Sequence, residues 1–146
     1  GYNVRPLEMS GAIGSVQLKK WPQIEQRRID NAKHFVDLFH SKPWCRIQQI
    51  IGESSWFTFG MVLDGELKGR RAEIVKALDE AGIQNRPLAS RNFLKQPVMR
   101  DLDYIASGEM TAADDIHDNG FFVGNGSKDI RDELDQLYTT IVKFVE

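Results

Sequence analysis

The chain has 146 residues, of which 41% are hydrophobic and 27% are charged, and its net charge is -2. These values are typical of one globular domain with a single core, and the small net charge gives no electrostatic reason to expect binding to nucleic acid or to an anionic membrane. No apolar run approaches transmembrane length, and the first residues do not resemble a signal peptide. The single cysteine, Cys45, excludes an internal disulfide framework and favours a reducing cytoplasm.

Two helices are predicted at the start of the chain, with a break between them. Pro6 suits a first helical turn, and apolar residues recur behind it at helical spacing as far as Lys20. The dipeptide Trp21-Pro22 predicts the break, because proline lacks the backbone N–H that a helix interior needs. The second helix then runs over residues 23–41 and ends at Lys42-Pro43.

The first of these helices is unusually rich in small residues, namely Ser10, Gly11, Gly14 and Ser15. Each glycine costs a helix about 1 kcal/mol relative to alanine. Such a helix makes sense where another backbone packs closely against it. The partner is either another part of this domain, or else a missing domain or a second subunit.

A period of two over residues 54–64 predicts a strand. Both of its faces are rather apolar, so we expect a central, covered strand with a short neighbour at 47–51. One face carries Phe57, Phe59, Met61 and Leu63, and the other carries Trp56, Thr58, Gly60 and Val62.

The rest of the chain alternates between helical and extended patterns. We expect a helix over 70–81 with a left-handed cap at Gly82, and a short strand over 83–88. An irregular stretch over 89–108 precedes a helix over 110–119, a strand over 120–124 and a last helix capped by Ser127. The order predicts a fold of the α/β class, an α+β sandwich in which helices pack on a small sheet.

The search for a metal site finds one acidic cluster, made of Asp114, Asp115, His117 and Asp118. Helical geometry places Asp114 and Asp118 on one face and Asp115 on another. This pattern favours a solvated acidic helix, and no metal site is predicted. An alternative is that His117 or Asp118 lines a cleft formed with another domain.

Cations and amides gather in the irregular stretch, where Arg86, Arg91 and Lys95 accompany Asn92 and Gln96. Such donors suit phosphate groups or sugar hydroxyls. Scattered surface cations would give the same pattern, so chemistry alone leaves both interpretations open.

The opening run, Gly-Tyr-Asn-Val-Arg-Pro-Leu-Glu-Met, is followed by Ala12-Ile13-Gly14 and by residues 17–20, Gln-Leu-Lys-Lys. This pattern resembles the signature of the DegT/DnrJ/EryC1/StrS sugar aminotransferase family, and the helix over 23–41 resembles the family's next helix. The resemblance covers essentially the whole chain. It implies that residues 1–146 form the small C-terminal domain of a fold-type-I pyridoxal-phosphate enzyme, with active sites at a homodimer interface.

A second motif points to one branch of that family. Residues 82–88 and 91–97 are similar to the "R…GN…QP" loop of 3-dehydratases that act on nucleotide-linked 4-keto-6-deoxy sugars, and residues 118–125 resemble the same branch. The chain departs from the motif at one position, because Arg91 stands where glycine is expected before Asn92.

The resemblance assigns roles to five residues. It implies that Asn3 binds the phosphate of pyridoxal 5'-phosphate in the neighbouring subunit and that Arg5 lies close by; alternatively, both residues only anchor the first helix. Gln84, Arg86 and Asn92 are the candidates for contact with the sugar nucleotide.

The catalytic residue implied by the resemblance lies upstream of Gly1, so the chain alone is expected to be inactive. Aminotransferases of the family bind the cofactor covalently through a lysine, whereas the 3-dehydratases carry a histidine there that serves as a base. The resemblance therefore implies a cytoplasmic 3-dehydratase of deoxysugar or O-antigen synthesis. Two alternatives remain: an aminotransferase of the same family, and a non-catalytic dimerisation module, which the small residues of helix 9–16 support.

Overall fold

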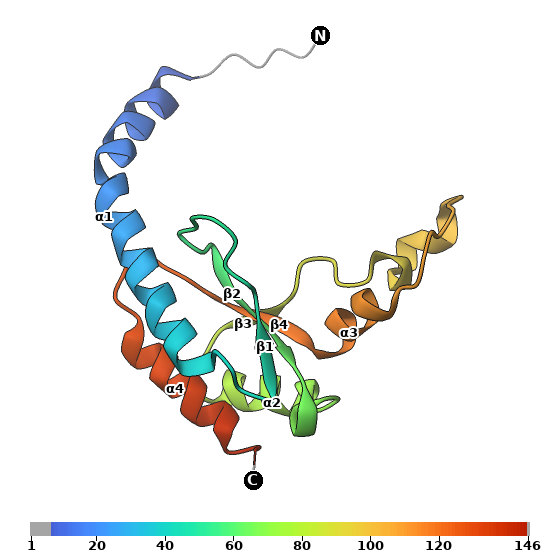
Figure 1. Ribbon diagram of the computed structural model, residues 1–146. Coiled ribbons are helices and arrows are strands. Elements are labelled where there is room, and N and C mark those ends of the chain that lie inside the picture. Colours follow the sequence, from blue (N-terminus) through green and yellow to red (C-terminus); the bar gives the residue numbers. More distant parts are fainter. Residues whose placement is uncertain (1–6, 146) are drawn as a thin grey trace.

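A four-stranded antiparallel sheet forms the centre of the molecule, as seen in a computed structural model that describes residues 7–145 (Figure 1). The strands lie in the order β1 (Cys45–Ile47), β2 (Thr58–Leu63), β4 (Gly120–Gly124) and β3 (Asn85–Pro87). Three helices, α1 (Glu8–Phe39), α2 (Arg71–Glu80) and α4 (Arg131–Val142), pack on one face. The predicted α+β sandwich is confirmed.

The core lies between that helical layer and one face of the sheet. Phe59, Met61 and Leu63 alternate along β2, and each is fully buried. Burying one such side chain contributes roughly 1.5–3 kcal/mol. Helices and strands supply the other members of the core, which include Phe35, Phe39, Ile74, Leu78, Phe121, Val123, Leu134, Leu137 and Ile141.

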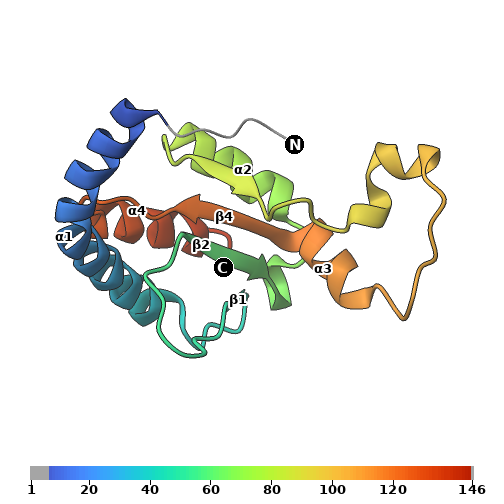
Figure 2. The same cartoon turned by 90° about the horizontal axis from the view of Figure 1, so that it is seen from above.

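A projecting arm joins β3 to β4 and extends away from the helical layer (Figures 1 and 2). It contains the short 3-10 helices Phe93–Lys95 and Pro97–Asp101 and then helix α3 (Thr111–Asn119), which contacts β2 and β4. The helix expected over 110–119 is confirmed. Among the described residues, none of the helices combines the length and the apolar character needed to cross a bilayer.

The predicted break at Trp21-Pro22 is wrong, because α1 is one helix of 32 residues with Pro22 inside it. The second half of α1 is fixed by burial of Ala32, Phe35 and Phe39 in the core. Proline removes only one backbone hydrogen bond from the helix, and intact helical turns on both sides keep the segment continuous.

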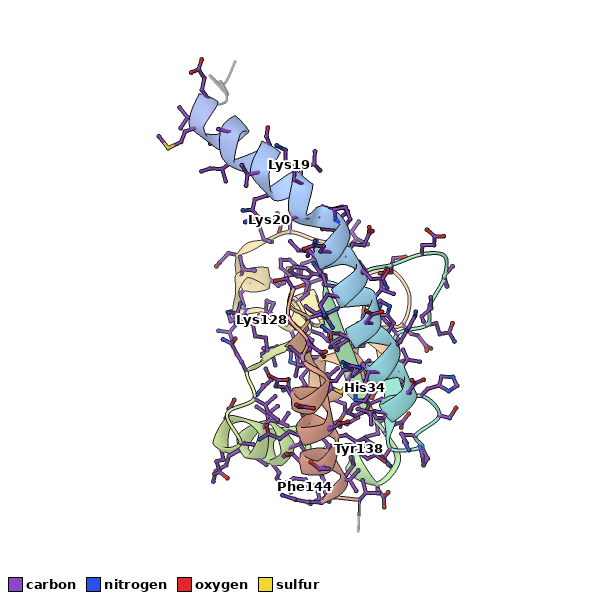
Figure 3. The ribbon with its side chains drawn as sticks, turned by 90° about the vertical axis from the view of Figure 1, so that its left-hand side faces the viewer. Lys19, Lys20, His34, Lys128, Tyr138 and Phe144 are labelled. Carbon is purple, nitrogen blue, oxygen red and sulfur yellow. The ribbon has the colours of Figure 1, made fainter. Side chains whose placement is uncertain are left out.

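The first half of α1 extends beyond the rest of the molecule (Figure 3). Its apolar side chains are exposed, Met9 and Leu18 each at 73%, and a Cβ added at Gly11 or Gly14 would meet nothing within 4 Å. Close packing of these small residues within the domain is therefore wrong. The remaining interpretation is that their partner is another domain or another subunit.

The predicted alternation of the 54–64 segment fails at its start. Trp56 is buried and Phe57 is 81% exposed, the reverse of the expected pattern. The reason is that Trp56 has a left-handed backbone with φ of 51°, so the strand begins only at Thr58. β2 is central as predicted, but its second face is only half-buried.

Three shorter elements also test the sequence prediction. α2 and the left-handed Gly82, with φ of 76°, are confirmed. The neighbour of β2 lies at Cys45–Ile47, earlier than the expected 47–51. Ser127 does not cap the last helix, which begins at Arg131. There the Asn31 Oδ1 accepts from the Ile130 N–H at 3.3 Å, so a residue distant in sequence satisfies the helix start.

Two buried asparagines connect α1 to the segments that flank the sheet. Asn125 Nδ2 donates to the backbone oxygens of Trp56 at 2.9 Å and Arg28 at 3.1 Å, and its Oδ1 accepts from Asn31 Nδ2 at 3.2 Å. Asn31 Nδ2 also donates to the Lys128 oxygen at 2.8 Å. Because buried polar groups are costly when unpaired, these contacts fix the position of α1 relative to the sheet.

We predict that Asn125→Ala lowers the free energy of unfolding by about 2–3 kcal/mol, because it removes the buried hydrogen bonds that join the segment after β4 to α1 and to Trp56. Urea denaturation followed by tryptophan fluorescence would measure the change. Asn85→Ala is the matched control: Asn85 is half-buried and bonds only within its own neighbourhood. Its expected effect is below about 1 kcal/mol, and equal effects of the two variants would contradict the prediction.

Cys45 lies in the core, and its burial raises the pKa of the thiol to about 12. Only the thiolate reacts readily with disulfide reagents, and at pH 8 such a thiol is ionised in about one molecule in ten thousand. We predict slow labelling of Cys45 by a disulfide reagent at pH 8 and fast labelling in urea. Fast labelling of the folded chain would contradict the burial of this residue.

Candidate functional site

The second face of the sheet is only half-buried, and Arg86, one of the candidate residues, lies exposed on it. Arg86 lies opposite Phe122 in the β3–β4 pairing, and Phe122 lies opposite Gly60 in the β2–β4 pairing. Because side chains alternate along a strand, these residues share the face opposite the core residues Phe121 and Val123. This face is therefore available to contact something other than the helical layer.

A groove of about 600 Å³ runs between β3 and the start of α4. Gln84 and Arg86, two of the predicted substrate-binding residues, both line it and are both exposed. Phe57 also lines the groove, and the guanidinium carbon of Arg28 lies 5.8 Å from the centroid of the Phe57 ring. The groove thus combines an amide, a guanidinium and an aromatic ring, which suit hydroxyl or phosphate oxygens and a flat ring respectively.

Asn92, the third predicted contact, has its polar atoms engaged within the fold. It is 4% exposed; its Nδ2 donates to Asp114 at 2.7 Å and its Oδ1 accepts from the Leu94 N–H at 3.0 Å. Gln96 Nε2 closes the same loop by donating to the Ser90 oxygen at 2.8 Å. The structure therefore brings Gln84 and Arg86 together in the groove but places Asn92 as the anchor of the loop that follows β3.

The acidic residues of α3 form ion pairs. Lys95 Nζ lies 2.8 Å from Asp114 and 3.8 Å from Asp118, which confirms that these two aspartates share a face. Hydrogen bonds from Lys95 and, next, from Asn92 lower the pKa of Asp114. Asp115 points elsewhere and pairs with Arg46 and with Lys68. Over residues 7–145, no group of three or more histidine, cysteine, aspartate or glutamate side chains is placed to hold a metal ion.

Two residues of the predicted site lie outside the described part of the chain, and one residue of the groove was missed by the sequence prediction. Asn3 and Arg5, the predicted cofactor contacts, lie outside the described residues 7–145. Phe57 was predicted on the strand face that carries Phe59, Met61 and Leu63, and its position at the groove depends on the left-handed turn at Trp56. That turn is held by Arg28, whose Nη2 donates to the Trp56 oxygen at 2.8 Å, and no local sequence signal marks this long-range contact.

A family model, described as the DegT/DnrJ/EryC1/StrS aminotransferase family, matches residues 1–141. The chain belongs to this family. The resemblance seen in the opening run is thereby confirmed.

Relatives of this chain include 3-dehydratases. The chain is 49% identical over 144 residues to GDP-4-keto-6-deoxy-D-mannose 3-dehydratase of Yersinia pseudotuberculosis, a match that covers 98% of the chain and 37% of the relative. It is also similar to the solved Escherichia coli enzyme of that kind with bound hydrated pyridoxal phosphate, with a TM-score of 0.87 and 43% identity over 96% of the chain and 36% of the other.

A further solved structure is a histidine-to-asparagine variant of GDP-4-keto-6-deoxymannose-3-dehydratase with bound GDP-perosamine. The TM-score is 0.88, with 43% identity over 97% of the chain and 37% of the other. The chain thus spans a little over a third of the length of these relatives. Over that third, the fold of the chain is similar to the fold of these relatives, as the resemblance implied.

We predict that Asn92→Ala increases backbone hydrogen exchange in residues 90–96 and lowers the free energy of unfolding by about 1–3 kcal/mol, because a buried anchor is lost. Exchange monitored by mass spectrometry would locate the change. Asn92→Asp sharpens the test, since a carboxylate still accepts from the Leu94 N–H but repels Asp114. Unchanged exchange in both variants would contradict the anchoring role.

Proposed function

We propose that this chain is the small C-terminal domain of a pyridoxal-phosphate-dependent 3-dehydratase, which removes the C3 hydroxyl of a GDP-linked 4-keto-6-deoxy sugar. The observation that carries the proposal is its 49% identity, over nearly the whole chain, to a dehydratase of that specificity. Deoxysugar or O-antigen synthesis in the cytoplasm is the setting we infer for such a reaction. The buried free thiol of Cys45 is compatible with that compartment.

Gln84 and Arg86 are the residues that we propose to contact the sugar nucleotide. Both are exposed on the groove, and within residues 7–145 the side chain of neither residue makes a hydrogen bond or ion pair. Their amide and guanidinium donors are therefore free for sugar hydroxyl or phosphate oxygens. Asn92 supports the same contact from a distance, by fixing the loop that follows Arg86.

The cofactor is proposed to be held mainly by parts of the protein other than residues 7–145. When bound, pyridoxal phosphate supplies an electron sink that assists loss of the C3 hydroxyl. Asn3 and Arg5 are the residues of this chain that we propose to donate to its phosphate in the neighbouring subunit of a homodimer. An amide N–H and a guanidinium are suitable donors to phosphate oxygens. The donors on the groove, Gln84 and Arg86, fit the substrate side of such a site.

The exposed half of α1 supports the proposed assembly. Its apolar side chains, such as Met9, Ile13 and Leu18, are more than half exposed. Exposed apolar side chains gathered on one projecting helix are typical of a contact with another domain or protein. If this small domain completes an active site by contacting other parts of the protein, those contacts would cover the exposed half of α1 and the second face of the sheet.

The test uses the complete protein that contains this chain, loaded with pyridoxal phosphate and treated with borohydride. We expect the cofactor to stay removable by dialysis, because a histidine enzyme holds it without a covalent bond. Covalent trapping would show a lysine-bound cofactor and would favour the alternative, a sugar aminotransferase of the same family. A protein that binds no cofactor would favour the non-catalytic dimerisation module.

A further inference from the structure

Phe57 is an exposed aromatic ring on a tightly held turn. The backbone oxygen of the preceding residue, Trp56, accepts from Arg28 Nη2 at 2.8 Å, from Arg28 Nε at 3.3 Å and from Asn125 Nδ2 at 2.9 Å. The Trp56 N–H donates to Ser54 Oγ at 3.1 Å. Phe57 is nevertheless 81% exposed, so the fold presents this ring at a fixed position on the surface.

This turn has a conformational cost. Trp56 has a φ of 51°, in the left-handed region that bulky side chains rarely adopt. The turn buries Trp56 in the core and leaves the large apolar ring of Phe57 in water, although burial of such a ring is favourable. Strained backbone persists only where the surrounding structure enforces it, and it is found often at ligand-binding positions. Phe57 is therefore a candidate for direct contact with a ligand.

One face of the Phe57 ring is already occupied. The guanidinium carbon of Arg28 lies over the ring, 5.8 Å from its centroid, where the π electrons attract a cation. Arg28 is itself held in place by its two hydrogen bonds to Trp56. Because the Phe57 side chain is so exposed, the opposite face of the ring is accessible and offers a flat apolar surface.

The groove provides space beside this ring. Phe57 and Thr58 line it from the β2 side, and Gln84 lines it from the β3 side. Gly124 also lines it and is the partner of Thr58 in the β2–β4 pairing, and a Cβ there would meet nothing within 4 Å. The volume of the groove, about 600 Å³, is ordinary for a small-molecule site. The groove therefore has room for a planar heterocycle next to Phe57.

We propose that Phe57 stacks on the guanine base of the GDP-linked sugar, so that the ring lies between the base and Arg28. This assignment rests on the proposed function, because the substrate inferred there carries a guanine nucleotide. Bases stack on aromatic side chains because every base has a π face. The base is therefore the part of the substrate that suits an uncharged ring, whereas hydroxyl and phosphate oxygens need donors such as Gln84 and Arg86.

The experiment measures GDP binding to the complete protein by calorimetry. Phe57→Ala is expected to weaken GDP affinity about fivefold to hundredfold, the range that follows from loss of one base–aromatic stack. Phe57→Trp keeps a stacking surface and should retain the affinity. Pyrophosphate, which has no base, should bind equally to the variants and to the unaltered protein.

Phe57→Leu separates stacking from a contact with another part of the protein. Leucine keeps much of the apolar bulk that a protein contact would use, but it has no π face. It should therefore lose GDP affinity as Phe57→Ala does, with a melting temperature close to that of the unaltered protein. A lower melting temperature with unchanged GDP affinity would assign the ring to a protein contact and overturn the proposal.

Fluorescence gives a second readout. The indole introduced by Phe57→Trp should lose emission when GDP is added, because a stacked base quenches it. The signal is the difference between this variant and the unaltered protein, which carries Trp21, Trp44 and Trp56. Pyrophosphate should leave this difference unchanged. Absence of quenching by saturating GDP would contradict the stack.

Tyr104→Ala is the matched control, since Tyr104 is also an exposed aromatic residue but lies on the arm, outside the groove. It should leave GDP affinity unchanged. The proposal is overturned by unchanged GDP affinity in Phe57→Ala, by an equal loss in Tyr104→Ala, or by an equal loss of affinity for GDP and for pyrophosphate.

The two proposals can fail separately. A protein that binds no pyridoxal phosphate, but whose GDP affinity depends on the Phe57 ring, would refute the proposed function and support the stack. An active dehydratase of a GDP-linked sugar whose GDP affinity is the same in Phe57→Ala and Phe57→Leu as in the unaltered protein would refute only the stack.

Discussion

The contact between Asn31 and Asn125 is the constraint on which the rest of the structure depends. It joins the long helix α1 to the segment after β4, and Asn125 also binds the backbone at Trp56, before β2. These segments are far apart in sequence, yet all of the polar atoms involved are shielded from water. Because the cost of leaving them unpaired is high, α1 and the two central strands are held in one arrangement.

That arrangement determines which residues face outward. With Trp56 buried and its oxygen held by Arg28, the chain turns and Phe57 is placed at the rim of the groove. Burial of one face of β2 and β4 against the helices leaves the other face for Arg86 and Phe122. The polar network of the core thus positions the candidate site, although none of its members is proposed to contact substrate.

The molecule is one-sided, and this agrees with the role of a small domain within a larger enzyme. Its helical layer is closed by a well-packed aromatic core, in which Phe35 and Phe59 stack at 4.5 Å between ring centroids. In contrast, the second face of the sheet leaves Phe122 half-buried and Arg86 exposed, and the first half of α1 exposes apolar side chains. A surface of this kind is expected where other parts of a protein complete the structure.

The sequence by itself determined the features that depend on neighbouring residues. Helical periodicity gave α2 and α3, the glycine signal gave the left-handed cap at Gly82, and the opening motif gave the family. Only the tertiary structure decided the features that depend on distant partners. These are the continuity of α1 through Pro22, the burial of Trp56 in place of Phe57, and the anchoring role of Asn92. The physical reason is that core burial and long-range hydrogen bonds outweigh local preference, and neither leaves a pattern in adjacent residues.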